Sequence, residues 1–415
     1  MKNLGIKISL LLNYLVFAML LNSVGTVILQ VQRNFDIPKA DASFLEGFKD
    51  LPIAIASFIL ASFLPKLGLK NSMLIALFLV SIICGILPFV GEFWFFKLMF
   101  FVIGISFALI KVSTFATIGL ITNNEKQHGS FMGFLEACFM AGILFGNFMF
   151  SWLIDDNNPK SEKWLFGFWI LSGISIIAFV FLLFSKLNEN EAKIAERSLI
   201  DDFLDMIKIA IKPLVIVFII SAFFYVLIEQ SFQTWFPTFY ENILKTPSSL
   251  AIQAGAILAG ASMVGRLLTG GVLAKIKWIY FLSFCLIIVS IIVLIALPLA
   301  NKTVLPTETI TWLNAPFVVY LMPLMGLFLA PIYPTINSTI LSALPKHQHS
   351  AMSGLIVVFS ALGGTTGSMI TGHVFESFSG TTAFYFSLIP ISVIFILLWV
   401  LFYMTKNFNK NEIKH

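Results

Sequence analysis

Charged residues are scarce in this chain of 415 residues. Asp, Glu, Lys and Arg make up only 11% of it, while 58% is hydrophobic, and the mean hydropathy is +0.94. An average soluble domain has about 25% charged and about 45–50% apolar residues. So few charges cannot cover a surface that faces water. The composition therefore excludes soluble enzymes, nucleic-acid binders and secreted disulfide scaffolds, and it predicts a multi-pass protein of a lipid bilayer.

Cysteines and cofactor motifs are also sparse. The three cysteines, Cys84, Cys138 and Cys285, lie in apolar runs, away from any CxxC pair or histidine cluster. We find no nucleotide-binding loop, metal-ligand cluster or paired nucleophile and base. We therefore expect no catalytic residues, metal site, cofactor or enzyme activity. The first apolar run, 6–31, is too long for a cleavable signal peptide.

Long apolar runs fill most of the chain. A helix that crosses a bilayer needs about 20 mostly apolar residues. A polar connection, 186–212, divides the runs six and six, which predicts an all-α membrane protein with an N-terminal six-helix bundle (1–185), a cytoplasmic linker (186–212) and a C-terminal six-helix bundle (213–415). The twelve predicted transmembrane helices are 6–31, 43–64, 72–91, 95–121, 129–154, 164–185, 213–238, 250–274, 278–300, 312–343, 350–375 and 382–404, the tenth of them interrupted by Pro323, Pro331 and Pro334.

Basic residues fall mainly on one side of these spans. With both termini in the cytoplasm, 16 of the 26 Lys and Arg residues face the cytoplasm and 7 face the opposite side. Such a bias is typical of membrane proteins and sets their orientation. We therefore expect a multi-pass protein of the cell (inner, or cytoplasmic) membrane with both termini cytoplasmic. The bias also explains the net charge of +5 without a nucleic-acid partner.

The two halves share a short basic turn after their second helix. The first turn is 61–70 (ASFLPKLGLK) and the second is 271–278 (GVLAKIKW). This is the parallel repeat of a transporter whose halves rock about a central site. Small residues four apart favour close helix packing in lipid, and they occur at Gly133/Ala137/Ala141, Gly142/Gly146, Ala251/Gly255/Ala259 and Gly363/Gly367.

The first turn resembles the signature of the major facilitator superfamily, with Pro65 in place of the signature's Asp. The matching positions are Ala61, Phe63, Pro65, Lys66, Gly68 and Lys70. Four further stretches resemble the fucose–galactose–proton symporter type of that superfamily: 225–237 (YVLIEQSFQTWFP), Gly265-Arg266, 326–336 (GLFLAPIYPTI) and 353–364. The resemblance implies the major facilitator fold, with twelve transmembrane helices in two six-helix bundles, and proton-coupled uptake of a sugar by alternating access.

The chain departs from this type at the positions that couple protons. The resemblance implies an acid in helix 1, a Glu in helix 4 and an Asn in helix 5. Here the first span offers Asn13, Asn22 and Ser23 instead of an acid, the helix 4 position matches Lys111, and the helix 5 position falls at or beside Glu136. A buried Lys and Arg suit a carboxylate or another anion, so an organic anion, an amino acid and a peptide stay open beside a sugar.

Seven ionisable residues lie inside predicted spans. Each costs about 2.5–3.5 kcal/mol even on insertion scales, so each is a functional candidate. Lys111 and Glu136 lie about 15 and 10 Å from the same membrane face at the helical rise per residue, so we expect them to pair. The pair is either a structural salt bridge or one that a proton or an anionic group opens. The seven are Glu46, Lys49, Asp50, Lys111, Glu136, Glu229 and Arg266.

Glu229 is the first candidate for proton coupling and Asp50 the second. Glu229 has no cation three or four residues away, so burial favours its neutral form. Asp50 has a like charge, Glu46, four residues before it, whereas we expect the adjacent Lys49 to face elsewhere. The alternative is that the second span protrudes outward and water surrounds Glu46, Lys49 and Asp50.

The remaining predicted site residues line a central cavity or control a gate. We assign Arg266, Lys66 and Lys70 to gating and expect Arg266 near the cytoplasmic side, with Glu229 in the outer half of its span. The predicted cavity residues are Asn22, Lys111, Glu136, Glu229, Gln230, Gln233, Trp235 and Asn337.

These patterns favour a secondary active transporter. The stretches between spans are too short for an ATPase domain, so the energy must come from a gradient. We expect a monomer that imports a small polar solute with protons. A receptor or sensor on the same fold is the alternative of another class, and it would carry a long tail or an added domain. The tails here are 1–5 and 405–415, which favours the transporter.

The predicted orientation can be tested at the linker. A cysteine placed at Lys193 should react with a membrane-impermeant maleimide only from the cytoplasmic side, because 186–212 is predicted to be cytoplasmic. A cysteine at Lys160, in a predicted outer loop, is the matched control and should react from outside. Labelling of position 193 from outside would reverse the orientation.

Overall fold

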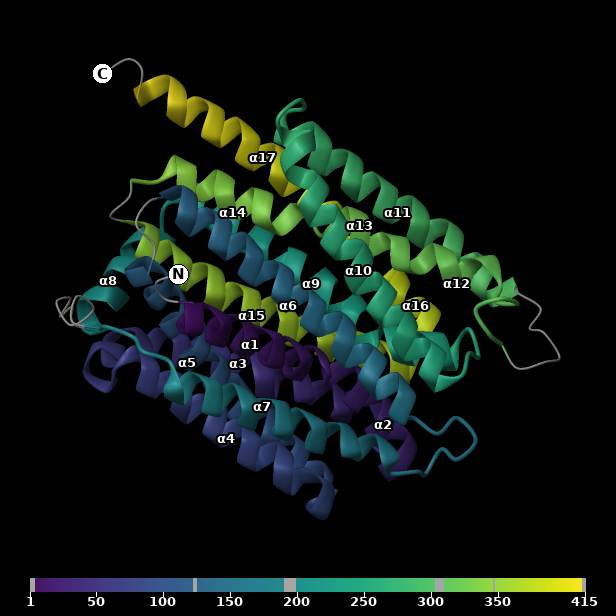
Figure 1. The fold of residues 1–415 in the computed structure, drawn as a ribbon. Helices are drawn as coiled ribbons and strands as arrows, with labels where there is room; N and C mark the ends of the chain where they lie inside the picture. The colour runs from purple at the N-terminus through teal and green to yellow at the C-terminus, as the bar shows by residue number, and fades with distance from the viewer. Residues whose placement is uncertain (1–3, 122–124, 190–198, 303–309, 346–347, 413–415) are drawn as a thin grey trace. The chain divides into compact units, whose positions relative to one another are not determined.

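A computed structural model describes residues 4–121, 125–189, 199–302, 310–345 and 348–412, and these residues are helical apart from short connections (Figure 1). The chain forms two compact units. Unit 1 comprises Met1–Ile37 and Leu45–Leu199, and unit 2 comprises Pro38–Phe44 and Ile200–His415. One helix, α3, therefore starts in unit 2 and continues in unit 1.

The helices of unit 1 correspond to the first six predicted spans. They are α1 (Leu4–Asn22), α2 (Val24–Phe35), α3 (Lys39–Leu67), α4 (Leu69–Val90), α5 (Phe93–Ile121), α6 (Glu125–Leu153), the 3₁₀ turn η1 (Lys163–Leu165) and α7 (Phe166–Phe184).

The helices of unit 2 follow the linker helix α8 (Leu199–Ala210), which starts at the unit boundary. They are α9 (Pro213–Asn242), α10 (Ser248–Leu273), α11 (Trp278–Lys302), α12 (Phe317–Leu321), the 3₁₀ turn η3 (Met322–Leu324), α13 (Met325–Leu329), α14 (Ile332–Ala343), α15 (His349–Ser377), α16 (Gly380–Tyr385) and α17 (Leu388–Glu412).

The structure confirms the all-α membrane architecture. Among the described residues, eleven helical segments are long and apolar enough to cross a membrane. The remaining predicted span, 43–64, lies in α3, which is 29 residues long and so extends about 43 Å at the rise of an α-helix. The hydropathy of α3 is lowered by six charged residues: Lys39, Asp41, Glu46, Lys49, Asp50 and Lys66.

The linker and the first span each show a local feature that the sequence-based predictions do not cover. Residues 199–210 of the linker form α8. The first span is one helical segment, Leu4–Phe35, in which a single turn residue, Ser23, separates α1 from α2. At this turn the Ser23 hydroxyl donates to the Leu20 carbonyl at 2.7 Å, and the Asn22 amide donates to the Ala18 carbonyl at 2.9 Å. Such side chains compete with the backbone for helical hydrogen bonds, which accounts for the local irregularity.

Glycines hold equivalent helices together in the two units. In unit 1, a Cβ on Gly142 of α6 would lie 2.5 Å from the Leu15 carbonyl oxygen of α1. In unit 2, a Cβ on Gly363 of α15 would lie 2.3 Å from the Phe223 carbonyl oxygen of α9. Each contact joins the first and fifth spans of its unit, so the repeat predicted from the turns extends to the packing. The predicted role of small residues in close packing is confirmed at these positions.

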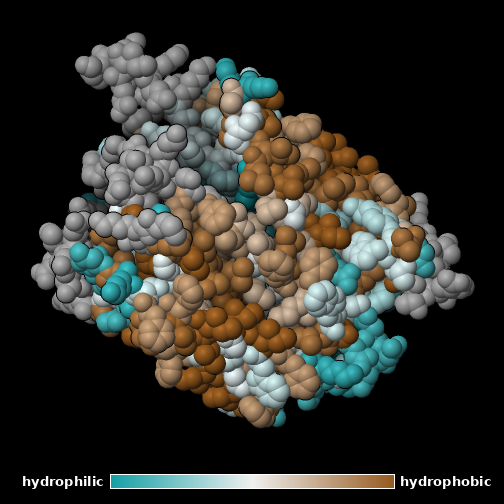
Figure 2. Space-filling view, viewed as in Figure 1, coloured by the Kyte–Doolittle hydropathy of each residue, from teal (hydrophilic) through white to brown (hydrophobic). Residues whose placement is uncertain are grey.

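The exposed side chains of the helices are largely apolar. Figure 2 shows apolar residues over much of the visible surface. Large side chains are among the most exposed, such as Phe89 at 78%, Trp152 at 81% and Phe184 at 79%. A water-soluble protein does not expose so many large apolar groups, whereas lipid accommodates them. The surface therefore agrees with a membrane-spanning protein.

The C-terminal end of α2 is tied to the loop before η1. The Asn34 side chain donates to the Pro159 carbonyl at 2.8 Å and accepts from the Trp164 indole at 2.6 Å, and Lys160 pairs with Asp36 at 2.6 Å. Within unit 1, α2 is therefore fixed at its C-terminal end and adjoins the Ser23 turn at its N-terminal end.

A reciprocal cap joins α4, α7 and the start of the linker. The Glu189 carboxylate accepts from the backbone N–H groups of Leu69 and Lys70 at 2.9 and 2.8 Å, and so caps the N-terminus of α4. The Lys70 ammonium donates to the carbonyls of Leu183 and Ser185 at 2.9 and 2.7 Å, at the C-terminus of α7. Each charge faces the helix end of opposite partial charge.

This cap generates a stability prediction. Glu189→Ala should lower the free energy of unfolding by about 1 kcal/mol, because two N–H groups of α4 lose their acceptor. Gly68→Ala should cost more, since Gly68 has φ +87° and a Cβ there would lie 3.0 Å from a Glu189 oxygen. Denaturant unfolding of the purified protein measures both. Lys186→Ala, at an exposed linker position, is the control, and an equal loss in the control would contradict the cap.

Candidate functional site

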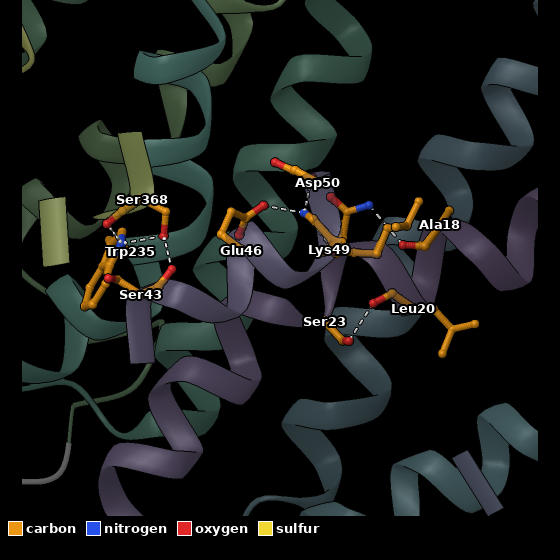
Figure 3. A network of polar contacts seen from close by, with 11 residues as sticks. Ala18, Leu20, Ser23, Ser43, Glu46, Lys49, Asp50, Trp235 and Ser368 are labelled. Carbon is orange, nitrogen blue, oxygen red and sulfur yellow. Dashed lines mark hydrogen bonds and ion pairs between the residues drawn. The ribbon is translucent and has the colours of Figure 1, made fainter. Parts of the chain in front are cut away.

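Three charged side chains are buried together in unit 1. Glu46, Lys49 and Asp50 of α3 are 0%, 5% and 8% exposed. The Lys49 ammonium forms ion pairs with Glu46 and, at 3.5 Å, with Asp50 (Figure 3). It also donates to the Leu21 carbonyl at 3.4 Å. The ammonium therefore connects two acids of α3 to the last turn of α1. We call these three residues the α3 charge cluster.

The cluster corrects two sequence-based expectations. Water does not surround it, because all three side chains are buried. Lys49 also does not face away from Asp50, since its flexible four-carbon stem lets the ammonium reach a carboxylate on the adjacent residue. The backbone is tightly packed here as well, because a Cβ on Gly104 of α5 would lie 2.5 Å from the Lys49 carbonyl oxygen.

The predicted Lys111–Glu136 pair is not a direct ion pair. Both residues are described, but their charged groups do not come within 4.0 Å. Lys111 is half-buried, with its ammonium 5.9 Å from the centre of the Phe107 ring, while Glu136 is exposed on α6. The aromatic ring stabilises the ammonium in place of a carboxylate. Glu136 is still close enough to interact electrostatically with Lys111 and Tyr14.

Glu229 has a cationic partner that its own helix did not reveal. The Glu229 carboxylate accepts from the Tyr225 hydroxyl at 2.9 Å and lies 3.5 Å from the Arg266 guanidinium of α10. Glu229 has no cation three or four residues away on its own helix, as the sequence shows, but this count does not include Arg266, which comes from another helix. We also expected Glu229 in the outer half of its span and Arg266 near the cytoplasmic side. This difference in depth is wrong, because the long Arg266 side chain brings its guanidinium beside the Glu229 carboxylate.

Two tyrosines and further polar groups accompany this pair in unit 2. Tyr225 and Tyr333 stack with ring centres 5.5 Å apart, and Tyr333 shares a 2.7 Å hydrogen bond with Ser360. Among the described residues, the buried Arg266 Nε and Asn337 Oδ1 have no hydrogen-bond partner. Buried polar groups are normally satisfied, so these atoms are free to bind water or a solute.

The other predicted cavity residues occupy varied positions. Gln230 and Gln233 are half-buried on α9. Trp235 is fully buried, and its indole N–H donates to the Ser368 carbonyl at 3.0 Å and lies 3.2 Å from the Ser368 hydroxyl (Figure 3). Trp235 thus packs inside unit 2, where no solute can stack on it. The Asn22 side-chain amide donates to the Ala18 carbonyl within α1, so this N–H group is already hydrogen-bonded.

The three predicted gating residues lie in different surroundings. Arg266 binds Glu229, and Lys70 caps α7, while the side chain of Lys66 lies outside the described residues. A cavity of about 450 Å³ lies in unit 2 between the ends of α10, α11, α14 and α17, and its lining includes Thr269, Lys277, Trp278 and Phe402. No predicted site residue lines this cavity.

Tyr225 and Tyr333 are functional candidates that the sequence-based list omits, whereas Lys49 is among its seven ionisable residues. Tyr225 precedes Glu229 by four residues, a spacing that places two side chains on one helical face. That spacing was a usable signal. The position of Tyr333 depends on the tertiary packing of α14 against α9, which no local pattern reveals.

Comparisons with known proteins agree with this architecture. The family model of the Major Facilitator Superfamily matches residues 10–367. Among curated proteins, none matches the sequence. Similar solved structures include a D-xylose-proton symporter, with a TM-score of 0.68 and 12% identity over 95% of this chain and 96% of that chain.

Two further structures have the same fold. One comes from work on proton dependent oligopeptide transporters, with a TM-score of 0.72 and 13% identity over 98% of both chains. The other is a variant of the E. coli fucose:proton symporter FucP, with a TM-score of 0.60 and 15% identity over 96% of this chain and 99% of that chain. These likenesses show the fold, and the family match over most of the sequence shows the relationship: the chain belongs to the Major Facilitator Superfamily of membrane transporters.

Proposed function

We propose that this transporter moves a small polar solute into the cell together with protons, by alternating access. The observation that carries the proposal is the charge within the spanning helices of both units: the buried α3 charge cluster in unit 1 and the partly exposed Glu229–Arg266 pair in unit 2. Charge inside a membrane protein is costly and marks ion or substrate pathways. We further propose that the protein works as a monomer in the cell membrane, with both termini cytoplasmic.

The α3 charge cluster is the better candidate for the proton site. Two carboxylates there are buried together with one ammonium, and a carboxylate buried inside a membrane protein is a group that can carry a proton. Glu229, ranked first from the sequence, already has Arg266 as its counter-cation. We therefore place Asp50 and Glu46 ahead of Glu229 for proton coupling, and we keep Glu229 as part of the solute site.

The solute site proposed for unit 2 combines a ring platform with polar groups. The stacked rings of Tyr225 and Tyr333 provide an apolar surface against which a solute can pack. Arg266 Nε and Asn337 Oδ1 have no hydrogen-bond partner, so a solute can supply one. A sugar fits this set through its hydroxyl groups, and the sequence resemblance and the named sugar symporters support it.

An organic anion, an amino acid or a peptide is the second candidate. A carboxylate would compete with Glu229 for Arg266, and Lys111 remains a proposed cavity residue of unit 1. The oligopeptide transporters among the similar structures support this candidate. Asn22, Glu136, Gln230 and Gln233 remain proposed cavity residues, and Arg266, Lys66 and Lys70 remain proposed gating residues.

Substrate identification comes first in the experimental test. A thermal-shift screen of the purified protein against sugars, organic acids, amino acids and peptides should reveal one stabilising class, because a ligand that binds only the folded state raises its stability. Reconstituted protein should then accumulate that solute in vesicles when an inward proton gradient is applied. Accumulation that ignores the gradient would contradict proton coupling, and no binding or movement of any solute would favour the receptor alternative.

Variants then separate the two roles. Asp50→Asn should abolish gradient-driven accumulation while exchange of solute across the vesicle membrane continues, because the amide cannot carry a proton. Glu229→Gln should instead weaken solute binding by about tenfold or more, the range of one hydrogen bond to a charged group, and should leave the gradient response intact. Asp36→Asn, at an exposed carboxylate, is the matched control. Full accumulation by Asp50→Asn would move the proton site away from Asp50.

A further inference from the structure

We propose that the cavity between α10, α11, α14 and α17 binds the headgroup of an anionic phospholipid that carries free hydroxyl groups, the chemistry of phosphatidylglycerol. The cavity lies within unit 2, between helices that are labelled in Figure 1, and has a volume of about 450 Å³. Sites for small molecules usually have about 300–1,000 Å³. The described residues that line it include none of those proposed for proton coupling, the solute site or the gate, so this inference does not depend on the proposed function.

Aromatic side chains beside the cavity indicate that it lies at the level of lipid headgroups. The rings of Trp278 and Phe402, which line the cavity, have centres 5.8 Å apart. Tyr280 and Tyr403 join the same aromatic cluster through contacts with Trp399, and these two tyrosines are 54% and 57% exposed. Tryptophan and tyrosine gather where a membrane meets water. The cavity is therefore within reach of a phospholipid headgroup.

The turn between α10 and α11 supplies a cation for the lipid phosphate. Lys277 lines the cavity and is exposed. Among the described residues, no carboxylate lies within 4.0 Å of its ammonium. In the orientation proposed above this turn is cytoplasmic, and basic pockets between transmembrane helices on that side bind anionic headgroups. The Lys277 ammonium is therefore available to a phosphate, which it binds as a point charge.

The hydroxyl groups of the lining favour a headgroup that carries hydroxyls of its own. Thr269, Thr335 and Thr339 line the cavity, and each donates to the carbonyl four residues earlier, at 2.7, 2.7 and 2.9 Å. Because their hydrogens are used, their oxygens are left to accept from hydroxyl donors of a ligand. Ser338, exposed in the same lining, adds a hydroxyl that can donate to the phosphate. Phosphatidylglycerol offers both groups, whereas phosphatidylcholine has no donor and carries a positive group that Lys277 would repel.

The apolar part of the lining favours a lipid over a soluble phosphate compound. Leu273, Ile276 and Pro334 line the cavity together with the aromatic rings, and Ile276 is 47% exposed. Removing such apolar surface from water stabilises a complex in proportion to the area buried. The glycerol backbone and the first part of an acyl chain can cover these residues, and a soluble glycerol phosphate cannot.

The experiment measures the melting temperature of the purified protein in neutral-detergent micelles that contain phosphatidylglycerol or phosphatidylcholine with the same acyl chains. Phosphatidylglycerol should raise the melting temperature by about 2 °C or more relative to phosphatidylcholine, because a ligand of the folded state stabilises it. Glycerol 3-phosphate at the same phosphate concentration should have no effect. Equal melting temperatures in the two lipids would overturn the proposal, and an equal rise with glycerol 3-phosphate would overturn the assignment to a lipid.

A matched pair of variants assigns the effect to this cavity. Lys277→Gln should weaken phosphatidylglycerol binding by about tenfold or more, the range of one hydrogen bond to a charged group, and should remove most of the shift in melting temperature. Lys275→Gln is the control, because it removes the same charge from the same turn at an exposed residue outside the cavity lining. This control should keep at least half of the shift. Equal losses in the two variants would indicate a general attraction to an anionic surface and would overturn the site.

A further variant tests the cavity while both lysines stay in place. Ser338→Leu removes a donor from the lining and adds volume inside the cavity, so it should also lose the shift caused by phosphatidylglycerol. Native mass spectrometry provides a readout that does not depend on stability: the native protein should retain one phosphatidylglycerol molecule that Lys277→Gln and Ser338→Leu lose. A lipid retained by Ser338→Leu as well as by the native protein would lie outside the cavity and would overturn the proposal. Because no solute is transported in these tests, their failure is distinct from failure of the proposed symport.

Discussion

Compensation of buried charge is the constraint on which the internal organisation of each unit depends. A charge in a six-helix bundle cannot rely on water, so the bundle must bring a partner to it. Unit 1 does this with one lysine between two carboxylates and a backbone carbonyl. Unit 2 does it with an arginine, a glutamate and a tyrosine hydroxyl. The first arrangement has two acids and one base, and the second has one acid and one base.

The two arrangements also differ in exposure. The members of the α3 charge cluster are 0–8% exposed, whereas the side chains of Glu229 and Arg266 are 16% and 33% exposed. The pair of unit 2 is therefore the more accessible of the two, which agrees with the solute site proposed for it. The scaffold beneath these arrangements is nevertheless the same, because glycines of the fifth span contact carbonyls of the first span in both units.

The fold was largely predictable from the sequence, whereas the partners of the charged residues were not. Apolar runs of about 20 residues report directly on spanning helices, so the spans were recovered. The turn at Ser23 was not predicted, because Asn22 and Ser23 are only two polar residues within a long apolar run. Lys111 lies beside the Phe107 ring and not beside the expected carboxylate, and Arg266 lies beside Glu229. Both contacts depend on the length of the side chains and on how the helices pack. Neither is encoded in the spacing along one helix.

The reciprocal cap at Glu189 has a consequence for how the two halves can be separated. Glu189 follows the last helix of unit 1 yet closes the start of α4, so the first residues of the linker are structurally part of the N-terminal bundle. A split version of the transporter, made by co-expressing two fragments, should therefore be cut after residue 189. A cut at the end of α7 would transfer the carboxylate to the wrong fragment and leave the amino end of α4 open to solvent.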